Sequence, residues 1–334
     1  MDKTEWRMDP LTREWTIFNE SRALPPVYGR SDEAGLAESP FRAGLEHYAP
    51  HGVHHEGGAH GWQVRVVPNR APILRVEGDH VPMADGPYER LDGVGAHEIV
   101  IEDPGDRRFE DLPVPELAKV LSAWRARIED LMRDMRLRCF TVVKDIGKAA
   151  GQTIAHSLSQ VFAMAVIPAA LRRKLESARD YYAVKERSLF ADVLAEEKRR
   201  AARVVYENAG YVVFCPYASR APFEVAIWPK RQSADFHHTN HEELVQLAEA
   251  LRIGLARMNR ALGNPAWHFT LTTAPSRALH ANEWPTIEED FRWHASIVPR
   301  LYPTSGFEIA TGCHVNGVWP EVAADFLRAQ EIAP

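Results

Sequence analysis

The sequence predicts an α+β fold built from two similar modules, each an antiparallel sheet with packed helices. The chain has 334 residues, which is long enough for two cores of ordinary size. Apolar residues make up 45% and charged residues 26% of it, as in folded globular proteins and unlike disordered or fibrous ones. Strands, then a long helix, then further strands are indicated once in each half of the chain, and this order suggests the repeated module.

The first half opens with an Asp-Pro turn at Asp9 and an extended apolar segment, which predict a strand within residues 9–18. Residues 21–61 are rich in Pro, Gly, His and acidic residues and predict a long irregular segment. The other elements predicted here are strands at 62–67 and 98–102, a helix at 115–136 with apolar residues at helical spacing, and strands at 139–144 and 154–166 around a turn at 147–151.

The second half repeats this pattern. It predicts helices at 188–203, 241–262 and 320–329, and strands at 204–206, 211–216, 224–229, 267–272 and 294–299. We therefore expect one module over residues 1–175, which carries the candidate active-site segment, and a second over residues 176–334.

Charge and composition restrict the partners. The formal charge of −6 provides no broad basic field for a nucleic acid. The N-terminal residues lack the apolar core of an export signal, and no apolar run reaches membrane-spanning length. Cys139, Cys215 and Cys313 are isolated, which favours a reducing, cytoplasmic location. A small-molecule ligand is expected, with neither nucleic acid nor membrane as partner.

Five histidines fall in the irregular segment: His47, His51, His54, His55 and His60. A metal site is one interpretation of this cluster. Because the spacing follows no ligand pattern, a solvated, variable segment is the preferred interpretation.

The most distinctive stretch is Val142 to Gln160, VVKDIGKAAGQTIAHSLSQ. Its glycines permit a turn whose backbone can approach a ligand closely. Polar groups follow on an otherwise apolar strand: Thr153, His156, Ser159 and Gln160. The stretch predicts a phosphate pocket, and an ordinary loop-to-strand junction is the alternative.

Short motifs along the chain resemble the galactose-1-phosphate uridylyltransferase family of the histidine-triad superfamily. The motifs are Arg7 with Asp9-Pro10-Leu11-Thr12-Arg13-Glu14-Trp15, Val64-Arg65-Val66-Val67-Pro68-Asn69, His97-Glu98-Ile99-Val100-Ile101-Glu102, the segment 151–160, Pro222-Phe223-Glu224-Val225, Phe291-Arg292-Trp293-His294 and Gly306-Phe307-Glu308. The resemblance covers nearly the whole chain, and it implies histidine-triad-like modules and a homodimer.

The family transfers a nucleotidyl group between a nucleotide sugar and a sugar 1-phosphate. A histidine of a His-Pro-His-Ser-Gln motif attacks the α-phosphorus and forms a covalent nucleotidyl-histidine. The corresponding residues here are His156-Ser157-Leu158-Ser159-Gln160, so the position of the nucleophile is Leu158. Leucine has no lone pair, and the usual covalent route cannot run through this residue.

The resemblance also implies that both metal sites of the family are lost. The segment that carries Cys-x-x-Cys in many members is Ser39-Pro40-Phe41-Arg42, and Asp106 replaces a histidine, so only His156 remains of four ligands. A second site of some relatives would correspond to Glu197, Thr272, Arg292 and His294, with half of its ligands missing. We expect no metal and no other cofactor.

Several residues match family positions that hold the nucleotide or its phosphates. They are Arg22, Asn69, Thr153, Ser159 and Gln160, with Asp145 in place of an asparagine. Arginine can grip a phosphate with two hydrogen bonds, whereas an ionised Asp145 repels it unless a cation intervenes. Fold-maintaining polar contacts are the alternative role for each of them.

Four further histidine and glutamate residues are candidates with open roles. His156 is either a residual acid or base or a buried imidazole bonded to backbone groups, and His294 is expected to pack in the core. Glu308 and His314 belong to a segment that contacts the sugar in the neighbouring subunit's active site in the family, so substrate contact is an option.

Two functions follow. The first is a hexose-1-phosphate uridylyltransferase-like enzyme that reacts at phosphorus by another route, with a nucleotide sugar or nucleoside phosphate as ligand. The alternative is a pseudoenzyme, a non-catalytic or repurposed nucleotide-binding homologue.

Overall fold

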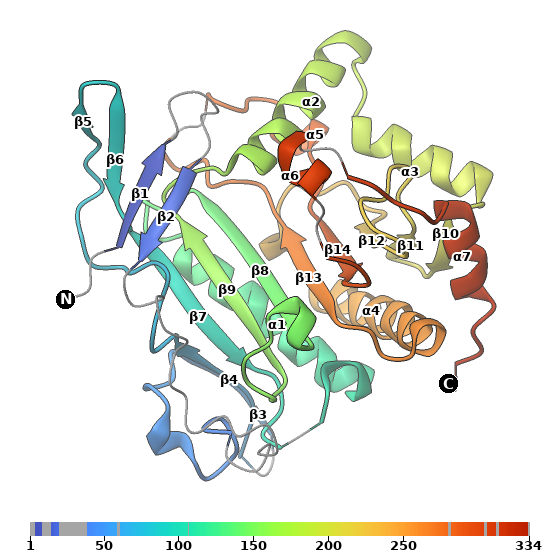
Figure 1. Cartoon of the computed structure of the whole chain (residues 1–334), viewed down its shortest axis with the longest axis horizontal. Helices are drawn as coiled ribbons and strands as arrows, with labels where there is room; N and C mark the ends of the chain where they lie inside the picture. Colours follow the sequence, from blue (N-terminus) through green and yellow to red (C-terminus); the bar gives the residue numbers. More distant parts are fainter. Residues whose placement is uncertain are drawn as a thin grey trace.

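A computed structural model describes residues 4–8, 15–19, 39–58, 61–105, 107–279, 282–303, 306–311 and 314–332. Its main feature is a ten-stranded sheet with the strand order β10-β11-β12-β14-β13-β8-β9-β7-β4-β3 (Figure 1). All neighbouring strands of this sheet are antiparallel. The predicted α+β class with an antiparallel sheet and packed helices is confirmed.

Both halves of the chain contribute strands to this one sheet. The first half supplies β3 (His54–Gly58), β4 (Gly61–Pro68), β7 (Gly95–Ile101), β8 (Cys139–Ile146) and β9 (Leu158–Met164), and the second half supplies β10 (Val204–Glu207), β11 (Tyr211–Phe214), β12 (Val225–Pro229), β13 (Trp267–Thr272) and β14 (His294–Pro299). The halves meet where β8 pairs with β13, here called the β8–β13 seam. Pairing along the seam satisfies backbone groups that two separate sheets would expose at their edges.

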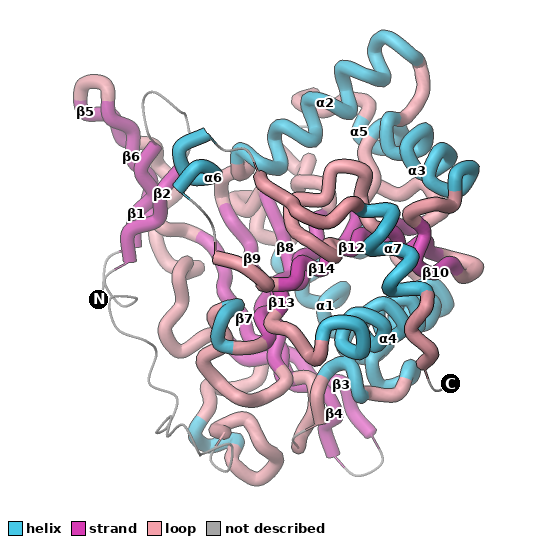
Figure 2. The backbone as a smooth tube through the Cα atoms, turned by 45° about the vertical axis from the view of Figure 1, so that its right-hand side comes forward, coloured by secondary structure: helices cyan, strands magenta, loops and turns pink. Residues whose placement is uncertain are grey.

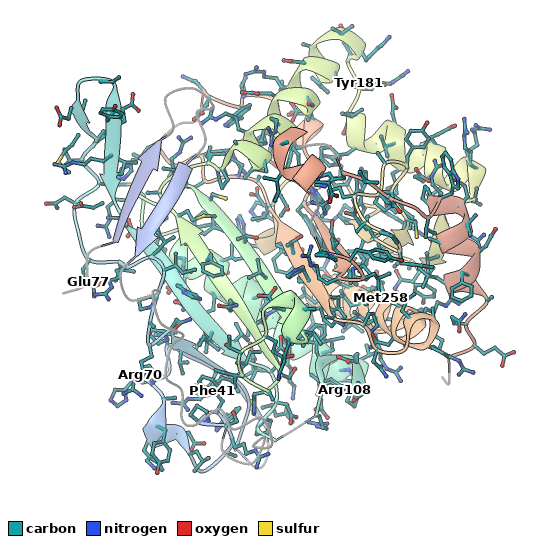
Figure 3. All side chains as sticks on the ribbon, in the orientation of Figure 1. Phe41, Arg70, Glu77, Arg108, Tyr181 and Met258 are labelled. Carbon is teal, nitrogen blue, oxygen red and sulfur yellow. The ribbon has the colours of Figure 1, made fainter. Side chains whose placement is uncertain are left out.

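Two long helices, α1 (Val114–Leu131) and α4 (His241–Leu262), contact each other and cover one face of the sheet. Asn240 and Glu243 form a reciprocal capping box at the start of α4, and Gly263 ends it in the left-handed conformation. The buried stripes of the helices include Trp124 of α1 and Met258 of α4, the latter labelled in Figure 3. This layer forms the principal core.

Shorter helices lie around the second half. They are α2 (Ala169–Lys185), α3 (Leu189–Arg200), α5 (Ile287–Asp290), α6 (Gly306–Thr311) and α7 (Pro320–Arg328). The helix α2 packs Leu171 and Leu175 in a cluster with Phe291 and Trp284, while Tyr181, near its C-terminal end, lies toward the outside of the molecule (Figure 3).

A second, four-stranded sheet stands apart from the main one (Figure 2). It has the order β2-β1-β6-β5 and consists of β1 (Thr4–Met8), β2 (Trp15–Asn19), β5 (Met83–Asp85) and β6 (Tyr88–Asp92). The strand predicted within 9–18 is seen as β2, and the sequence did not predict the other three strands.

Other differences are local. The helix α4 and the strands β13 and β14 have the bounds that the sequence predicts. The strand predicted from residue 154 begins only at Leu158, because residues 154–156 form a bend. The helix α2 was not predicted, and the module division at 175–176 stays a prediction. No helix in the described parts of the chain is long and apolar enough to cross a membrane.

Candidate functional site

The central strands β7, β9, β8 and β13 present two different faces. On one face, residues such as Val161 pack into the core with side chains of α1 and α4. Because side chains alternate along a strand, Gln160 projects to the opposite face. There Gln160 lies beside its β7 partner Ile99, and Asp145 lies beside its β13 partner His268. The polar candidates from the sequence therefore gather on the face that α1 and α4 do not cover.

A cavity of about 140 Å³ opens on this face. We call it the smaller cavity. Its lining consists of Asn69, Ile99, Asp145, Gly151, Gln152, Thr153, Ile154, His156, Leu158 and Gln160. The structure thus brings together four of the candidate ligand-binding residues, namely Asn69, Asp145, Thr153 and Gln160. Arg22 lies outside the described residues, so its ligand contact stays a prediction.

A buried histidine orders the side chain of Gln160. The Nδ1 atom of His97 accepts a hydrogen bond of 3.1 Å from the backbone N–H of Ile73, so Nε2 is the nitrogen that donates to Oε1 of Gln160, at 2.7 Å. Nδ2 of Asn69 lies 2.9 Å from the same nitrogen, but both are donors in this tautomer, whereas Oδ1 of Asn69 accepts from the N–H of Ala71 at 3.0 Å. Because Oε1 of Gln160 accepts from His97, its amide NH₂ group remains to donate to a phosphoryl oxygen.

The turn between β8 and β9 forms one wall of the smaller cavity. Gly147 has a φ of +83°, and a Cβ atom there would lie 2.7 Å from the side chain of Ala266. Gln152 closes the turn, because its Oε1 accepts from the N–H of Gly147 at 2.7 Å and its Nε2 donates to the carbonyl of Ile154 at 2.9 Å. The sequence predicts that the backbone of this turn approaches a ligand closely. In the structure Gly147 instead approaches Ala266, the residue before β13, and Thr153, which follows the turn, lines the cavity.

Leu158 lies at the start of β9 and faces the smaller cavity. It packs against an apolar cluster that includes Phe41, Ile99 and Ile101. His156, two residues earlier, is buried, and its Nε2 lies 2.9 Å from the backbone carbonyl of Asp103. This arrangement fits the interpretation of His156 as a buried imidazole bonded to backbone.

Ser159 lies on the other face of β9. Its hydroxyl accepts a hydrogen bond of 2.7 Å from the indole Nε1 of Trp124 in the core, and the side chain is fully buried. The structure therefore does not place Ser159 with the other candidate ligand-binding residues.

A buried ion pair contacts the backbone of the active-site segment at the start of β9. Nζ of Lys144 lies 2.5 Å from Oε2 of Glu102 and donates to the carbonyl of Leu158 at 3.0 Å. The hydroxyl of Ser157 donates to the same carboxylate oxygen at 2.6 Å. Both charged side chains are fully buried, so the pair fixes the backbone at the start of β9.

Asp145 connects the smaller cavity to a larger one. Its Oδ1 lies 2.7 Å from Nδ1 of His268 across the β8–β13 seam. His268 in turn lines a cavity of about 670 Å³, the larger cavity, together with Arg220, Arg300, Glu308 and His314 among others. The larger cavity therefore contains the two C-terminal candidates, Glu308 and His314. Sequence reasoning missed His97 and His268, because only strand pairing brings them to the site.

The residues matched to the first metal site do not resemble a metal centre here. Phe41 is fully buried and presents its ring edge to His156, with 6.1 Å between the ring centres. The hydroxyl of Ser39 accepts from the N–H of Phe41 at 3.3 Å. Asp106 lies outside the described residues.

The residues matched to the second metal site are bound to other protein groups. Glu197 binds Arg203 through both carboxylate oxygens, and the guanidinium of Arg292 donates to the backbone carbonyl of Lys230 at 2.9 Å. Nε2 of His294 lies 2.7 Å from Nζ of Lys174. The positive charges of Lys174 and Arg220 thus act on His294, which is an unfavourable setting for a metal ion.

His294 leads to a prediction about pH. Burial and the nearby Lys174 lower the pKa of His294 from 6.5 to about 3. The unfolded chain therefore binds one proton more than the folded chain between these values, and the folded state loses stability as the pH falls from 6.5 toward 3. This group should contribute up to about 1.4 kcal/mol per pH unit to the fall in the free energy of unfolding, measured by urea titration.

The variant His294→Asn isolates this contribution. The free energy of unfolding of this variant should fall less steeply with decreasing pH, by the amount that one proton contributes. The control His51→Gln, at an exposed site, should keep the slope of the parent protein. An equal slope in His294→Asn and the parent would assign the effect to other groups.

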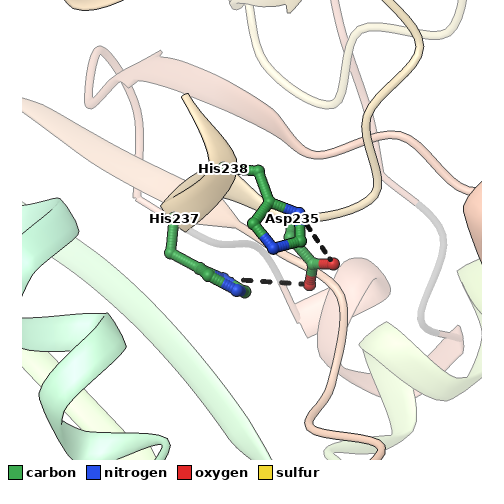
Figure 4. Close-up of side chains that lie close together, drawn as sticks. All are labelled: Asp235, His237 and His238. Atoms are coloured by element: carbon green, nitrogen blue, oxygen red, sulfur yellow. Dashed lines mark ion pairs between the residues drawn. The ribbon is translucent and has the colours of Figure 1, made fainter. Parts of the chain in front are cut away.

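One group of three potential metal ligands lies close together in the described residues: Asp235, His237 and His238 (Figure 4). The carboxylate of Asp235 is already bound by the guanidinium of Arg277, at 2.5 and 3.1 Å. His47, His51, His54 and His55 form no comparable group in the described part, and His60 lies outside it. The group does not touch either cavity and carries no function in our interpretation.

Two of the cysteines are described, and both are buried and unpaired. Burial raises the pKa of Cys139 and of Cys215 to about 12. Both are therefore thiols at neutral pH and unsuited to replace the missing nucleophile.

Comparisons with known proteins agree with this geometry. No family model matches the chain. An ADP-glucose phosphorylase of Arabidopsis thaliana is 29% identical over 97% of this chain and 92% of its own length. A galactose-1-phosphate uridylyltransferase of Thermotoga maritima is 24% identical over 98% of this chain and 99% of its own length.

Solved structures give the same result. The crystal structure of the Arabidopsis thaliana ADP-glucose phosphorylase with bound ADP-glucose has a TM-score of 0.77 and 26% identity, and the match covers 98% of this chain and all of that one. A uridylyltransferase mutant with a TM-score of 0.80 and 24% identity, matched over 97% of both chains, shares the fold.

The fold and the matches define the class of protein that this chain resembles: its homologues are proteins of the galactose-1-phosphate uridylyltransferase family, and its fold matches their histidine-triad-like structures. The particular proteins that it resembles over nearly its whole length are an ADP-glucose phosphorylase and several galactose-1-phosphate uridylyltransferases. The resemblance predicted from the sequence is confirmed.

Proposed function

We propose that this protein binds a nucleotide sugar in the two cavities and transfers its nucleotidyl group to a phosphorylated acceptor. The observation that carries the proposal is the assembly of Asn69, Asp145, Thr153 and Gln160 around the smaller cavity. A relative of nearly the same length holds ADP-glucose, which makes an adenine nucleotide sugar the first ligand to test.

The two cavities suit the two ends of such a ligand. The amide of Gln160, oriented by His97, can donate to a phosphoryl oxygen in the smaller cavity. The larger cavity offers the guanidinium of Arg300 for a phosphate and the carboxylate of Glu308 for sugar hydroxyls, while the guanidinium of Arg220 in its lining already binds the carboxylate of Glu224. A homodimer and a cytoplasmic location stay predictions of the family resemblance and of composition.

A pseudoenzyme is the second candidate, and Leu158 favours it. This side chain is packed in an apolar cluster at the position that the resemblance assigns to the nucleophile. Loss of a covalent nucleophile alone lowers turnover by many orders of magnitude unless another group replaces it. Binding would then remain without transfer.

Thermal stabilisation tests the proposed ligand class. A nucleotide sugar at 100 times its dissociation constant should add about 2.7 kcal/mol of stability. We expect a shift with ADP-glucose or UDP-glucose in a panel of nucleotides and nucleotide sugars. A panel without any shift would contradict the proposal.

The variant Gln160→Glu tests whether the ligand binds in the smaller cavity. It keeps an acceptor for Nε2–H of His97, so the fold should persist, but its negative charge repels phosphate. The ligand-induced shift should therefore disappear. The matched control Gln330→Glu, at the end of α7, should keep it, and an undiminished shift in Gln160→Glu would place the ligand elsewhere.

A further inference from the structure

We propose that His268, oriented by Asp145, supplies the reactive imidazole that position 158 lacks. This inference rests on the proposed function, because it requires a nucleotide sugar in the two cavities. It names a catalytic residue in β13 of the second half and a positioning residue, Asp145, in β8 of the first.

The pair has the geometry of an imidazole oriented by a carboxylate. Nδ1 of His268 lies 2.7 Å from Oδ1 of Asp145, and a carboxylate can only accept, so Nδ1 carries the proton. The lone pair is then on Nε2, the nitrogen on the far side of the ring. The side chains are 34% and 28% exposed, so a ligand can reach them. The hydrogen bond from His268 also partly offsets the negative charge of Asp145, which reduces the repulsion between Asp145 and a phosphate.

The pair lies on the same face of the sheet as the missing nucleophile. The pairing of β8 with β9 ends at Val143 opposite Gln160. Asp145 lies two residues beyond Val143 and Leu158 lies two residues before Gln160, so both side chains project to the same face of the sheet. Both line the smaller cavity, and His268 is the β13 partner of Asp145.

The pair also connects the two cavities. Asp145 lines the smaller cavity and His268 lines the larger one. In a nucleotide sugar that occupies both cavities, the diphosphate would therefore lie next to Asp145 and His268. Two other histidines are less suited to attack: His156, which lines the smaller cavity, and His97, which contacts Gln160, are both buried and hydrogen-bonded to fixed protein groups.

The chemical step conserves atoms and charge. Nε2 of His268 donates its lone pair to the α-phosphorus, and the bond from that phosphorus to the bridging oxygen breaks. The electron pair leaves with the sugar 1-phosphate. The imidazolium formed on His268 keeps its Nδ1 proton, which Asp145 stabilises. Phosphate or a second sugar 1-phosphate then attacks the same phosphorus, the phosphorus–nitrogen bond breaks, and neutral His268 is restored.

Mass spectrometry tests this step directly. The intact protein is incubated with ADP-glucose, or in parallel with UDP-glucose, without an acceptor, and quenched at alkaline pH, where a phosphorus–nitrogen bond survives. We expect a mass gain of one nucleotidyl group that peptide mapping assigns to His268. An adduct on any other residue overturns the inference.

Variants separate the inference from the proposed function. His268→Gln should lose the adduct but keep the thermal shift with the nucleotide sugar, and the control His51→Gln should keep both. If the parent protein shows the thermal shift but no adduct, the inference fails while binding stands. If neither ligand gives a shift, the inference and the proposed function both fail.

Asp145→Asn tests orientation separately from attack. An asparagine no longer fixes the Nδ1–H tautomer, so the initial rate of adduct formation should fall by roughly 10²- to 10⁴-fold, and its pH profile should shift. The adduct should still map to His268. An unchanged rate and pH profile would refute the role of Asp145.

Discussion

Replacing Leu158 with histidine in a His268→Gln background should create a nucleotidyl adduct at residue 158. The side chain of Leu158 already faces the smaller cavity beside Thr153 and Gln160. An imidazole is similar in volume to leucine, so the substitution needs little repacking. The resemblance to the family assigns the nucleophile to this position, and the new histidine would supply the missing lone pair.

The expected result is a gain from no adduct to a detectable fraction of protein with one added nucleotidyl group. It is measured by intact mass after incubation with ADP-glucose or UDP-glucose, followed by peptide mapping. Leu158→Asn in the same background is the matched control, since it adds polarity without a nucleophile. Retained ligand binding without any adduct on residue 158 would mean that the α-phosphorus lies out of its reach.

Replacing Lys144 with methionine should destabilise the fold by about 3–5 kcal/mol. The substitution leaves the Glu102 carboxylate buried beneath the active-site segment without its ammonium partner. It also removes the hydrogen bond to the carbonyl of Leu158 and the contact of Nζ with the Phe109 ring at 4.9 Å. Urea unfolding measures the loss as a lower midpoint at constant slope.

Two further variants complete this test. The double variant Lys144→Met/Glu102→Leu removes both charges and should recover most of the stability. The exposed control Lys185→Met should change it by less than about 0.5 kcal/mol. A single variant as stable as the control would show that Glu102 finds another partner or a proton.

Elements with strong local signals could be predicted from the sequence. The helix α4 has both a capping residue, Asn240, and a terminal glycine, Gly263, around a continuous apolar stripe. The helix α2 has neither, and its buried side chains are only Leu171, Leu175 and Ala178 among many charges. Its apolar stripe is therefore too narrow to stand out from a polar segment.

The site was predictable only in part, for a similar reason. Asn69 and Gln160 were identified through motifs that lie within single segments. The motif grouped Ser159 with Gln160 as candidates for ligand binding. Because side chains alternate along a strand, these two neighbours point to opposite faces of the sheet. The contact between Asp145 and His268 joins residues 123 positions apart, and no local pattern in the sequence indicates which strands of the two halves pair.

The β8–β13 seam has a consequence for how the protein is made. During synthesis, the residues of β8 are complete long before those of β13, so the edge of β8 has no partner until the second half emerges. Pairings of such large sequence separation form slowly and leave an exposed edge open to aggregation in the meantime. The contact between Asp145 and His268 requires both halves, so an incomplete chain would have neither the finished sheet nor this pair.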